Sequence, residues 1–189
     1  MANTEVFPVT QPRVLLLPGW LNSDAAHWQS RWEALHGDQR VEQDDWQWPK
    51  RGDWMTRLEE VLLQSDTPAV LVAHSLGCQL VAAWAAHSQH THRVRAALLV
   101  ALPDVERDDM PPQLALWRPI VRKPLPFASM AVVSSDDPYC APERAAQMAA
   151  DWGSELMSVG ARGHINGESG LGDWPQGRAM LRALIGVHD

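Results

Sequence analysis

Short continuous apolar runs recur along this chain, and each is followed by a segment with helical spacing. Such a run, ended by Pro, Gly or a polar residue, is typical of a strand buried on both faces. Alternating buried strands and helices favour a mostly parallel sheet of about five to six strands, in a three-layer α/β sandwich. The predicted strands cover residues 13–20, 40–46, 69–75, 93–103, 127–135 and 154–160. The predicted helices cover residues 27–37, 53–65, 77–88, 142–153 and 174–187.

The length bears on the number of domains. At 189 residues the chain is long enough for one domain with a sizeable core, and short for two. We therefore predict a single domain over residues 1–189, with residues 1–12 as a flexible N-terminal lead. A Pro-rich connection over residues 103–126 separates two of the predicted strands.

Charge and composition argue against several classes of partner. The formal net charge is −7 and the sequence has no basic stripe, so we expect no nucleic-acid partner. No apolar run reaches the roughly 18 residues of a membrane span, and the first residues lack the apolar core of a signal peptide. The two cysteines, Cys78 and Cys140, form neither a disulfide scaffold nor a CxxC pair. We expect a cytoplasmic protein that does not enter a membrane.

Reactive side chains follow the predicted strands. Ligands of open parallel sheets bind outside the carboxyl ends of the strands, where this chain places Ser75, Asp104, Asp136, Asp137 and His164. A serine hydroxyl becomes a nucleophile when a histidine removes its proton and a carboxylate orients that histidine. The order serine, acid, histidine therefore predicts a catalytic triad, with Ser75 as the nucleophile and His164 as the base.

Three aspartates compete for the role of the acid. Asp137 ranks first because the proline after it fixes the turn and directs its carboxylate towards the histidine loop. Asp104 ends the previous strand and ranks second. Asp136 is expected to point away and ranks third.

The stretch "AVLVAHSLGCQL" places the serine at the junction of a strand and a helix. A sharp turn there strains the backbone and lifts the hydroxyl clear of the sheet. Small residues two positions before and after the serine keep the turn free of clashes, and here these are Ala73 and Gly77. The position of Ala73 demands smallness more than glycine itself.

The loops around the serine predict the rest of the site. The amide of Leu76, at the start of a helix, is expected to stabilise an oxyanion, together with the amide of Trp20 or Leu21. The residues expected to border the substrate pocket, besides Trp20, are Trp117, Tyr139 and Ile165.

The remaining histidines are assigned no chemistry. His74 is interpreted as a structural neighbour of the nucleophile and not as a second base. His87, His90 and His92 lie in an exposed connection without the further ligands of a metal site, and the chain has no HExxH motif. We predict no metal and no cofactor.

Four motifs together resemble a known family. "VLLLPGWLNSDAAHWQSRWE", "VAHSLGC", "VVSSDDPYC" and "GARGHINGESGLGDWPQG" are similar to the retinoblastoma-binding protein 9 family of small serine hydrolases, especially its bacterial members, in the α/β-hydrolase superfamily. The resemblance runs from about Arg13 to Ile185. It implies Ser75 as nucleophile, Asp137 as acid and His164 as base. It also implies a shortened sheet without a large cap domain.

One departure concerns a protein partner. The human namesake is associated with an LxCxE motif that binds pocket proteins, whereas the nearest string here, "LGCQL", ends in Leu80. We therefore expect no retinoblastoma-type partner.

These observations predict a serine hydrolase that cleaves small ester, thioester or amide bonds through an acyl-enzyme. The expected partner of the enzyme is a small ester-like substrate. The sequence leaves the oligomeric state of the protein open. The alternative is a binding or regulatory protein that keeps the hydrolase scaffold with little turnover, because fold alone does not decide function.

Overall fold

Six parallel strands form one sheet in the computed structural model, which describes residues 11–186. The sheet has the order β2-β1-β3-β4-β5-β6. Its strands are β1 (Arg13–Leu17), β2 (Gln39–Arg40), β3 (Ala69–His74), β4 (Val94–Val100), β5 (Ala128–Val133) and β6 (Glu155–Ser158). The predicted α/β class with a parallel sheet is confirmed. The predicted N-terminal lead lies, up to residue 10, outside the described residues.

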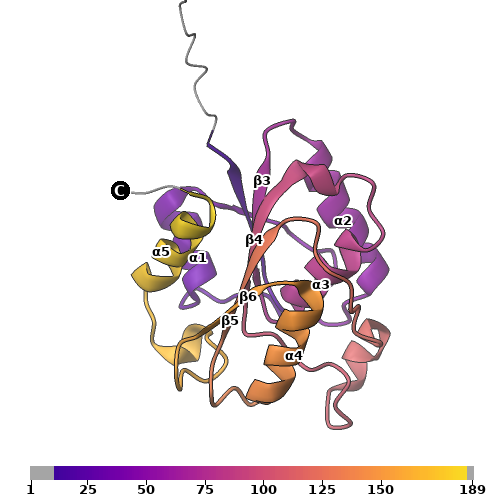
Figure 1. Cartoon of the computed structure of the whole chain (residues 1–189), viewed down its shortest axis with the longest axis vertical. Coiled ribbons are helices and arrows are strands. Elements are labelled where there is room, and N and C mark those ends of the chain that lie inside the picture. The colour runs from indigo at the N-terminus through magenta and orange to yellow at the C-terminus, as the bar shows by residue number, and fades with distance from the viewer. Residues whose placement is uncertain (1–10, 187–189) are drawn as a thin grey trace, which may run out of the picture.

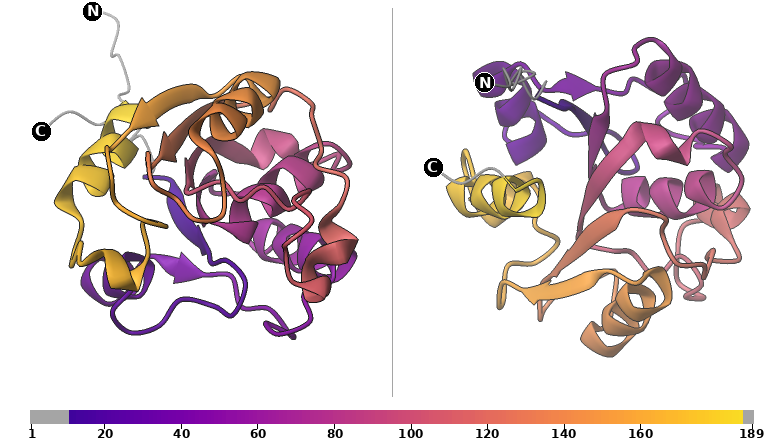
Figure 2. Two further views of the ribbon diagram at one scale, coloured as in Figure 1. Left: turned by 90° about the horizontal axis from the view of Figure 1, so that it is seen from below. Right: turned by 45° about the horizontal axis from the view of Figure 1, so that its top comes forward.

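Helices cover both faces of the sheet. The α-helices are α1 (Trp28–His36), α2 (Arg51–Leu63), α3 (Leu76–Ala85), α4 (Pro142–Trp152) and α5 (Pro175–Leu184). The short 3₁₀ helices are η1 (Thr91–Arg93), η2 (Pro112–Trp117) and η3 (Gly167–Ser169). Figure 1 and the right view of Figure 2 show α1 and α5 on one face, and α2, α3 and α4 on the other. None of the described helices is long and apolar enough to cross a membrane.

Alternate residues of the central strands pack into two separate cores. Leu71 of β3 packs into the core beneath α2, α3 and α4, which we call the α3-side core. Val70 and Val72 pack into the core beneath α1 and α5, which we call the α1-side core. Because helices cover both faces, the middle of these strands is apolar on both sides. This double burial explains the continuous apolar runs of the sequence.

The predicted strand over residues 40–46 is wrong in extent, because β2 ends at Arg40. The amide of Val41 still donates to the carbonyl of Leu16 at 2.9 Å. Further on, the carboxylate of Asp45 accepts hydrogen bonds from the amides two and three residues later, at 2.9 and 2.8 Å. This side chain turns the backbone away from the sheet.

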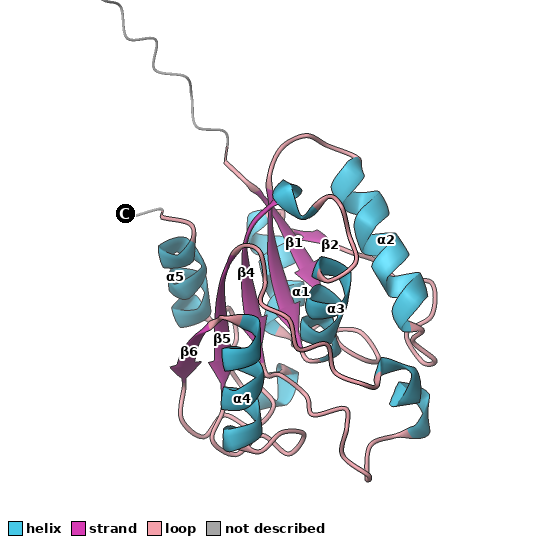
Figure 3. Cartoon of the chain, turned by 45° about the vertical axis from the view of Figure 1, so that its right-hand side comes forward, coloured by secondary structure: helices cyan, strands magenta, loops and turns pink. Residues whose placement is uncertain are grey.

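The predicted Pro-rich connection joins β4 to β5 and contains the short helix η2. Leu114 and Trp117 of η2 pack into the α3-side core, so the connection lies against the body of the protein. Within the described part of the chain, no separate helical domain is inserted between two strands. Figure 3 shows α3 and α4 in front of strands that run in one direction.

The order of the strands positions a binding site. From β1 the chain adds β2 on one side, and it then returns to place β3 on the other side. The loops after β1 and β3 therefore leave the sheet in opposite directions and open a crevice at the carboxyl ends of these strands. Ser75 follows β3 at this position.

Candidate active site

The backbone of Ser75 has a strained conformation, with φ 54° and ψ −123°. Positive φ is unfavourable for a residue with a side chain, and it persists only where the surroundings hold it. The amide of Ser75 donates to the carbonyl of Val100 at 2.9 Å, which ties the turn to β4. The serine side chain thus projects from a rigid junction between β3 and α3.

Two glycines make room for this turn. A Cβ atom on Gly77 would lie 2.2 Å from the carbonyl oxygen of Leu17, and one on Gly19 would lie 2.7 Å from the Cβ of Ser75. Both distances are far below van der Waals contact, so each glycine allows a close approach of two chain segments. Ala73, in contrast, is a regular residue of β3 and is fully buried.

His164 links Ser75 to Asp137. Its Nε2 lies 2.8 Å from the Oγ of Ser75, and its Nδ1 lies 2.9 Å from the Oδ2 of Asp137. The side chains of His164 and Asp137 are only 10% and 4% exposed. A carboxylate only accepts hydrogen bonds, so Nδ1 carries the ring hydrogen and Nε2 is free to accept from the serine hydroxyl. The structure therefore brings the three residues together in one chain of hydrogen bonds.

The other two aspartates have different partners. Asp104 pairs with Arg144, with 3.1 Å between Oδ2 and Nε. Asp136 accepts hydrogen bonds from the hydroxyl of Ser134 and the amide of Gly163, each at 2.7 Å, and these bonds lower the pKa of Asp136 below its usual value. Asp136 thus anchors the loop that carries the histidine, without contacting the histidine ring.

His74 lies directly before the serine and contacts His164. Its Nε2 lies 2.8 Å from the backbone carbonyl oxygen of His164, and the two rings meet edge to face with 4.9 Å between their centres. Because a carbonyl only accepts, Nε2 of His74 carries the hydrogen. Burial lowers the pKa of His74 well below its usual value, so this ring is neutral.

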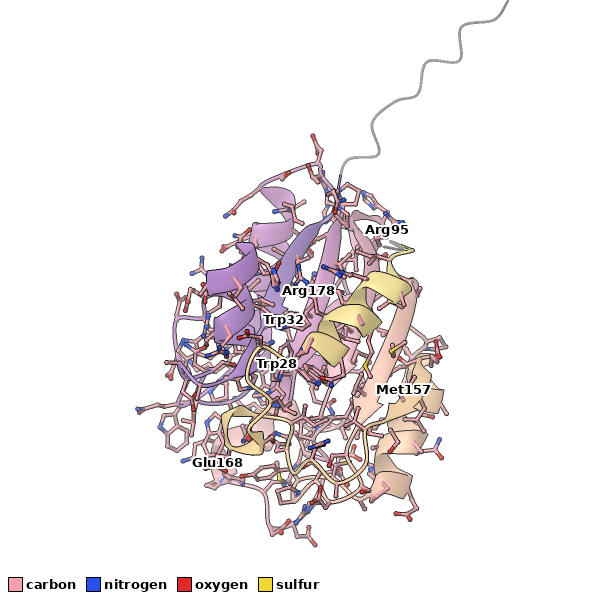
Figure 4. The ribbon with its side chains drawn as sticks, turned by 90° about the vertical axis from the view of Figure 1, so that its left-hand side faces the viewer. Trp28, Trp32, Arg95, Met157, Glu168 and Arg178 are labelled. Atoms are coloured by element: carbon pink, nitrogen blue, oxygen red, sulfur yellow. The ribbon has the colours of Figure 1, made fainter. Side chains whose placement is uncertain are left out.

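Two tryptophans of α1 hold the segment after β6. The indole of Trp28 donates to the carbonyl of Ile165 at 2.8 Å, and that of Trp32 donates to the carbonyl of Asp173 at 2.7 Å. Figure 4 shows both tryptophans beside α5. Buried indole N–H groups need such partners, and here the partners are backbone carbonyls on either side of η3.

A pocket of about 290 Å³ lies in front of the serine. Tyr139 lines it, as expected, and meets the His164 ring edge to face at 4.6 Å between centres. Trp117 and Ile165 were wrongly predicted to border it. Trp117 is 1% exposed and its indole donates to the carbonyl of Pro49, whereas Ile165 is fully buried in the α1-side core. Both side chains turn inwards from their loops.

Sequence reasoning missed most of the pocket lining. The missed residues are Gly19, Asn22, Asp24, His27, Pro103, Met110, Pro111, Leu114, Asn166, Gly167 and Glu168. They lie on the loops after β1, β4 and β6, so their position at the edge of the sheet was a usable signal. Which side chains of a loop face the crevice depends on the fold of that loop, which periodicity does not report.

The two expected oxyanion donors after β1 differ in their surroundings. The amide of Leu21 already donates to the carbonyl of Trp46 at 3.1 Å. Trp20 lines the pocket beside Leu76, whose amide begins α3. The geometry thus favours Trp20 over Leu21 as a donor to a ligand in the pocket.

Both thiols are free and buried. Burial raises the pKa of Cys140 to about 12 and that of Cys78 still further. Neither thiol is therefore a competing nucleophile. Within residues 11–186, no group of three or more His, Cys, Asp or Glu side chains is placed to hold a metal ion.

Comparison with known proteins adds independent findings. Residues 14–183 match the family described as "Serine hydrolase". A crystal structure of a protein described as a YdeN-like hydrolase from Pectobacterium atrosepticum is 30% identical, with a TM-score of 0.82, over 94% of this chain and 92% of that one. A comparison with curated proteins gave no match.

More distant structures share the fold. The ydeN gene product of Bacillus subtilis is 19% identical, with a TM-score of 0.70, over 93% of this chain and 100% of that one. An esterase from a Rhodococcus species is 14% identical, with a TM-score of 0.69, over 94% of this chain and 91% of that one. The sheet, its flanking helices and these matches identify a minimal α/β-hydrolase fold, and the chain belongs to the serine hydrolase family.

Proposed function

We propose that this protein cleaves small ester, thioester or amide bonds through an acyl-enzyme, with Ser75, His164 and Asp137 as its catalytic triad. The observation that carries the proposal is the position of His164, whose two ring nitrogens lie 2.8 Å from the serine Oγ and 2.9 Å from the aspartate Oδ2. Nucleophile, base and orienting carboxylate are thus within hydrogen-bond distance before any substrate binds.

The reaction follows from these contacts. The Oγ of Ser75 attacks the substrate carbonyl while Nε2 of His164 takes the hydroxyl proton, and Asp137 stabilises the imidazolium. The amides of Leu76 and Trp20 hold the oxyanion of the tetrahedral intermediate. When this intermediate collapses, His164 returns the proton to the leaving group. A water molecule, deprotonated by His164, then attacks the acyl-enzyme and releases the acid and the free serine.

The pocket supports small substrates. Its volume of about 290 Å³ is near the lower end of ligand sites, and the connection after β4 packs against the body of the protein and lines one side of the crevice. Short acyl groups fit such an open site. Within the serine hydrolases, we place the chain among the small bacterial members of the retinoblastoma-binding protein 9 family. We also propose a cytoplasmic location, for which two free thiols are suitable.

A fluorophosphonate probe tests the nucleophile. We expect covalent labelling of the wild type at Ser75 and none of Ser75→Ala, and we expect the same contrast in the hydrolysis of p-nitrophenyl acetate. Equal labelling of both proteins would remove Ser75 from the mechanism. A wild type that neither labels nor hydrolyses esters would support the alternative, a binding protein on a hydrolase scaffold.

A further inference from the structure

The pocket in front of the serine has two chemically different walls. One wall is apolar and comes from the end of β4 and the connection after it. Its residues are Pro103, Met110, Pro111 and Leu114. The other wall is polar and comes from the loops after β1 and β6. Its residues are Asn22, Asp24, His27, Asn166 and Glu168.

The two walls lie over opposite faces of the sheet. Leu114 of the apolar wall belongs to the α3-side core. His27 of the polar wall caps α1, and Gly167 approaches Asp24 so closely that a Cβ would lie 2.9 Å from the carboxylate. The loops after β1 and β6 therefore meet over the α1 side. Glu168, labelled in Figure 4, lies on the second of these loops.

The polar wall carries negative charge without a protein counterion. Asp24 and Glu168 are both exposed, and neither forms an ion pair with any residue that the structure describes. The Oδ1 of Asp24 accepts the amides of Ala26 and His27 at 2.8 and 3.0 Å. Its Oδ2 has no such partner within residues 11–186. These carboxylates favour a cation in the pocket.

An unpaired donor in the same wall independently indicates a polar ligand. The Nδ1 of His27 accepts the amide of Gln29 at 3.1 Å, so its Nε2 carries the ring hydrogen. His27 is 4% exposed, and this Nε2 has no hydrogen-bond partner in the described part of the chain. Burial lowers the pKa of His27 to about 4, so the ring is a neutral donor. A buried N–H without a partner is unfavourable until an acceptor from solvent or ligand meets it, and an oxygen of an ester is such an acceptor.

The chemistry of the proposed reaction decides which wall takes which half of the substrate. The leaving atom must lie beside Nε2 of His164, which returns the proton to it. Asn166 and Glu168 follow His164 on the same loop, and they line the pocket with it. The leaving group therefore faces the polar wall, and the acyl group faces the apolar wall next to Leu76.

We propose that the polar wall binds a positively charged leaving group, so that the preferred substrates are esters of amino alcohols with a small apolar acid. This inference rests on the proposed function, because it assigns the two halves of a substrate around the same serine. The carboxylates of Asp24 and Glu168 are exposed, so water and salt partly screen their attraction for a cation. We therefore expect a preference of roughly three- to tenfold in kcat/KM at low ionic strength.

Two esters of equal shape isolate the charge. Acetylcholine and 3,3-dimethylbutyl acetate differ by a quaternary nitrogen in place of a carbon, so the ratio of their kcat/KM values reports the effect of charge. We expect this ratio to favour acetylcholine, to fall as salt is added, and to approach one in the double variant Asp24→Asn/Glu168→Gln. Asparagine keeps the oxygen that accepts the amides of Ala26 and His27. Glu155→Gln, at the far end of β6, removes a similar charge and should keep the wild-type ratio.

The outcomes separate this inference from the proposed function. Hydrolysis of p-nitrophenyl acetate without a preference for the cationic ester overturns the inference alone, as does a preference that survives in the double variant. If the wild type hydrolyses none of the three esters (p-nitrophenyl acetate, acetylcholine and 3,3-dimethylbutyl acetate) and does not label with a fluorophosphonate, the proposed function is overturned, and the inference with it.

Discussion

The Nε2 of His74 donates a hydrogen bond to the backbone carbonyl of His164 across 2.8 Å. The residue before the proposed nucleophile therefore holds the backbone of the proposed base, although 90 positions separate the two in the sequence. This bond fixes the position of the histidine loop relative to the end of β3. The distance between the serine hydroxyl and the imidazole thus depends on a side chain that does not touch the substrate carbonyl in the proposed reaction.

Replacing His74 should slow the reaction without removing the triad. His74→Leu leaves the His164 carbonyl without its donor and loosens the ring, so we expect kcat on p-nitrophenyl acetate to fall by about ten- to a hundredfold. His74→Gln places an amide N–H near the position of Nε2 and should recover most of this loss. Equal activity of the leucine variant and the wild type, measured at matched folded fraction, would contradict the positioning role.

Gly77→Ala should destabilise the fold, because the added Cβ would lie 2.2 Å from the carbonyl oxygen of Leu17. Backbone at this point cannot move without disturbing β1, so we expect a loss of about 1–3 kcal/mol in the free energy of unfolding. The control is Gly52→Ala in α2, where nothing lies within 4 Å of the new Cβ. Urea unfolding should show the control unchanged or about 0.5–1 kcal/mol more stable. Comparable losses in both variants would refute the steric argument.

Acid should destabilise the protein through His27. Burial lowers the pKa of His27 to about 4 in the folded state, whereas the unfolded chain has an ordinary histidine pKa of about 6.5. Between these values the unfolded state binds the proton and the folded state does not. The contribution of neutral His27 to the free energy of unfolding is therefore fully present above pH 6.5. It is lost as the pH falls towards 4, and the total loss is about 3 kcal/mol.

The variant His27→Asn tests this linkage, because asparagine can still cap α1 but does not titrate in this range. The slope of unfolding free energy against pH reports the number of protons taken up on unfolding. Between pH 6.5 and 4.5 this number should be lower in the variant by up to one. It should not vanish, since the pKa of His74 is also lowered by burial. The two slopes, measured by urea unfolding at several pH values, must differ for the prediction to hold.

The two thiols should be unreactive in the folded protein. Cys78 and Cys140 are 0% and 2% exposed, and burial raises the pKa of each. We therefore expect Ellman's reagent at pH 8 to label neither residue in the native state and both in urea. Rapid labelling of either thiol without denaturant would show that its surroundings open readily.

The main architecture was predictable because strands that are buried on both faces have a recognisable sequence pattern. The runs around Leu71 and Leu98 are apolar at every position, since alternate side chains enter the two cores. The order of Ser75, Asp137 and His164 was likewise readable, because parallel strands bring the residues after them to one edge. Hydrogen bonding then separates Asp137 from Asp136, a distinction for which the following proline was the available signal.

The pocket was less predictable, because side-chain direction in loops is set by tertiary contacts. Trp117 and Ile165 follow strands or lie in strand connections, as pocket residues do, yet both side chains enter the cores. Nothing in the sequence singles out Asp24 and Glu168, and only the contact between their loops places them in one wall. The short β2 was overestimated for a similar reason, since Asp45 competes for the backbone amides after it.

The strand before His164 lies at the edge of the sheet, and most of its residues are exposed. Among the strands that the structure describes, it pairs with β5 alone, while the indoles of Trp28 and Trp32 hold the segment that follows. During synthesis, Ser75 and its neighbouring strands emerge long before the histidine that completes the site. A molecule whose final segment has not docked, or has detached, would retain most of its sheet but lack the proposed base beside its serine. Under the proposed mechanism, such a molecule has no hydrolase activity although most of its fold is intact.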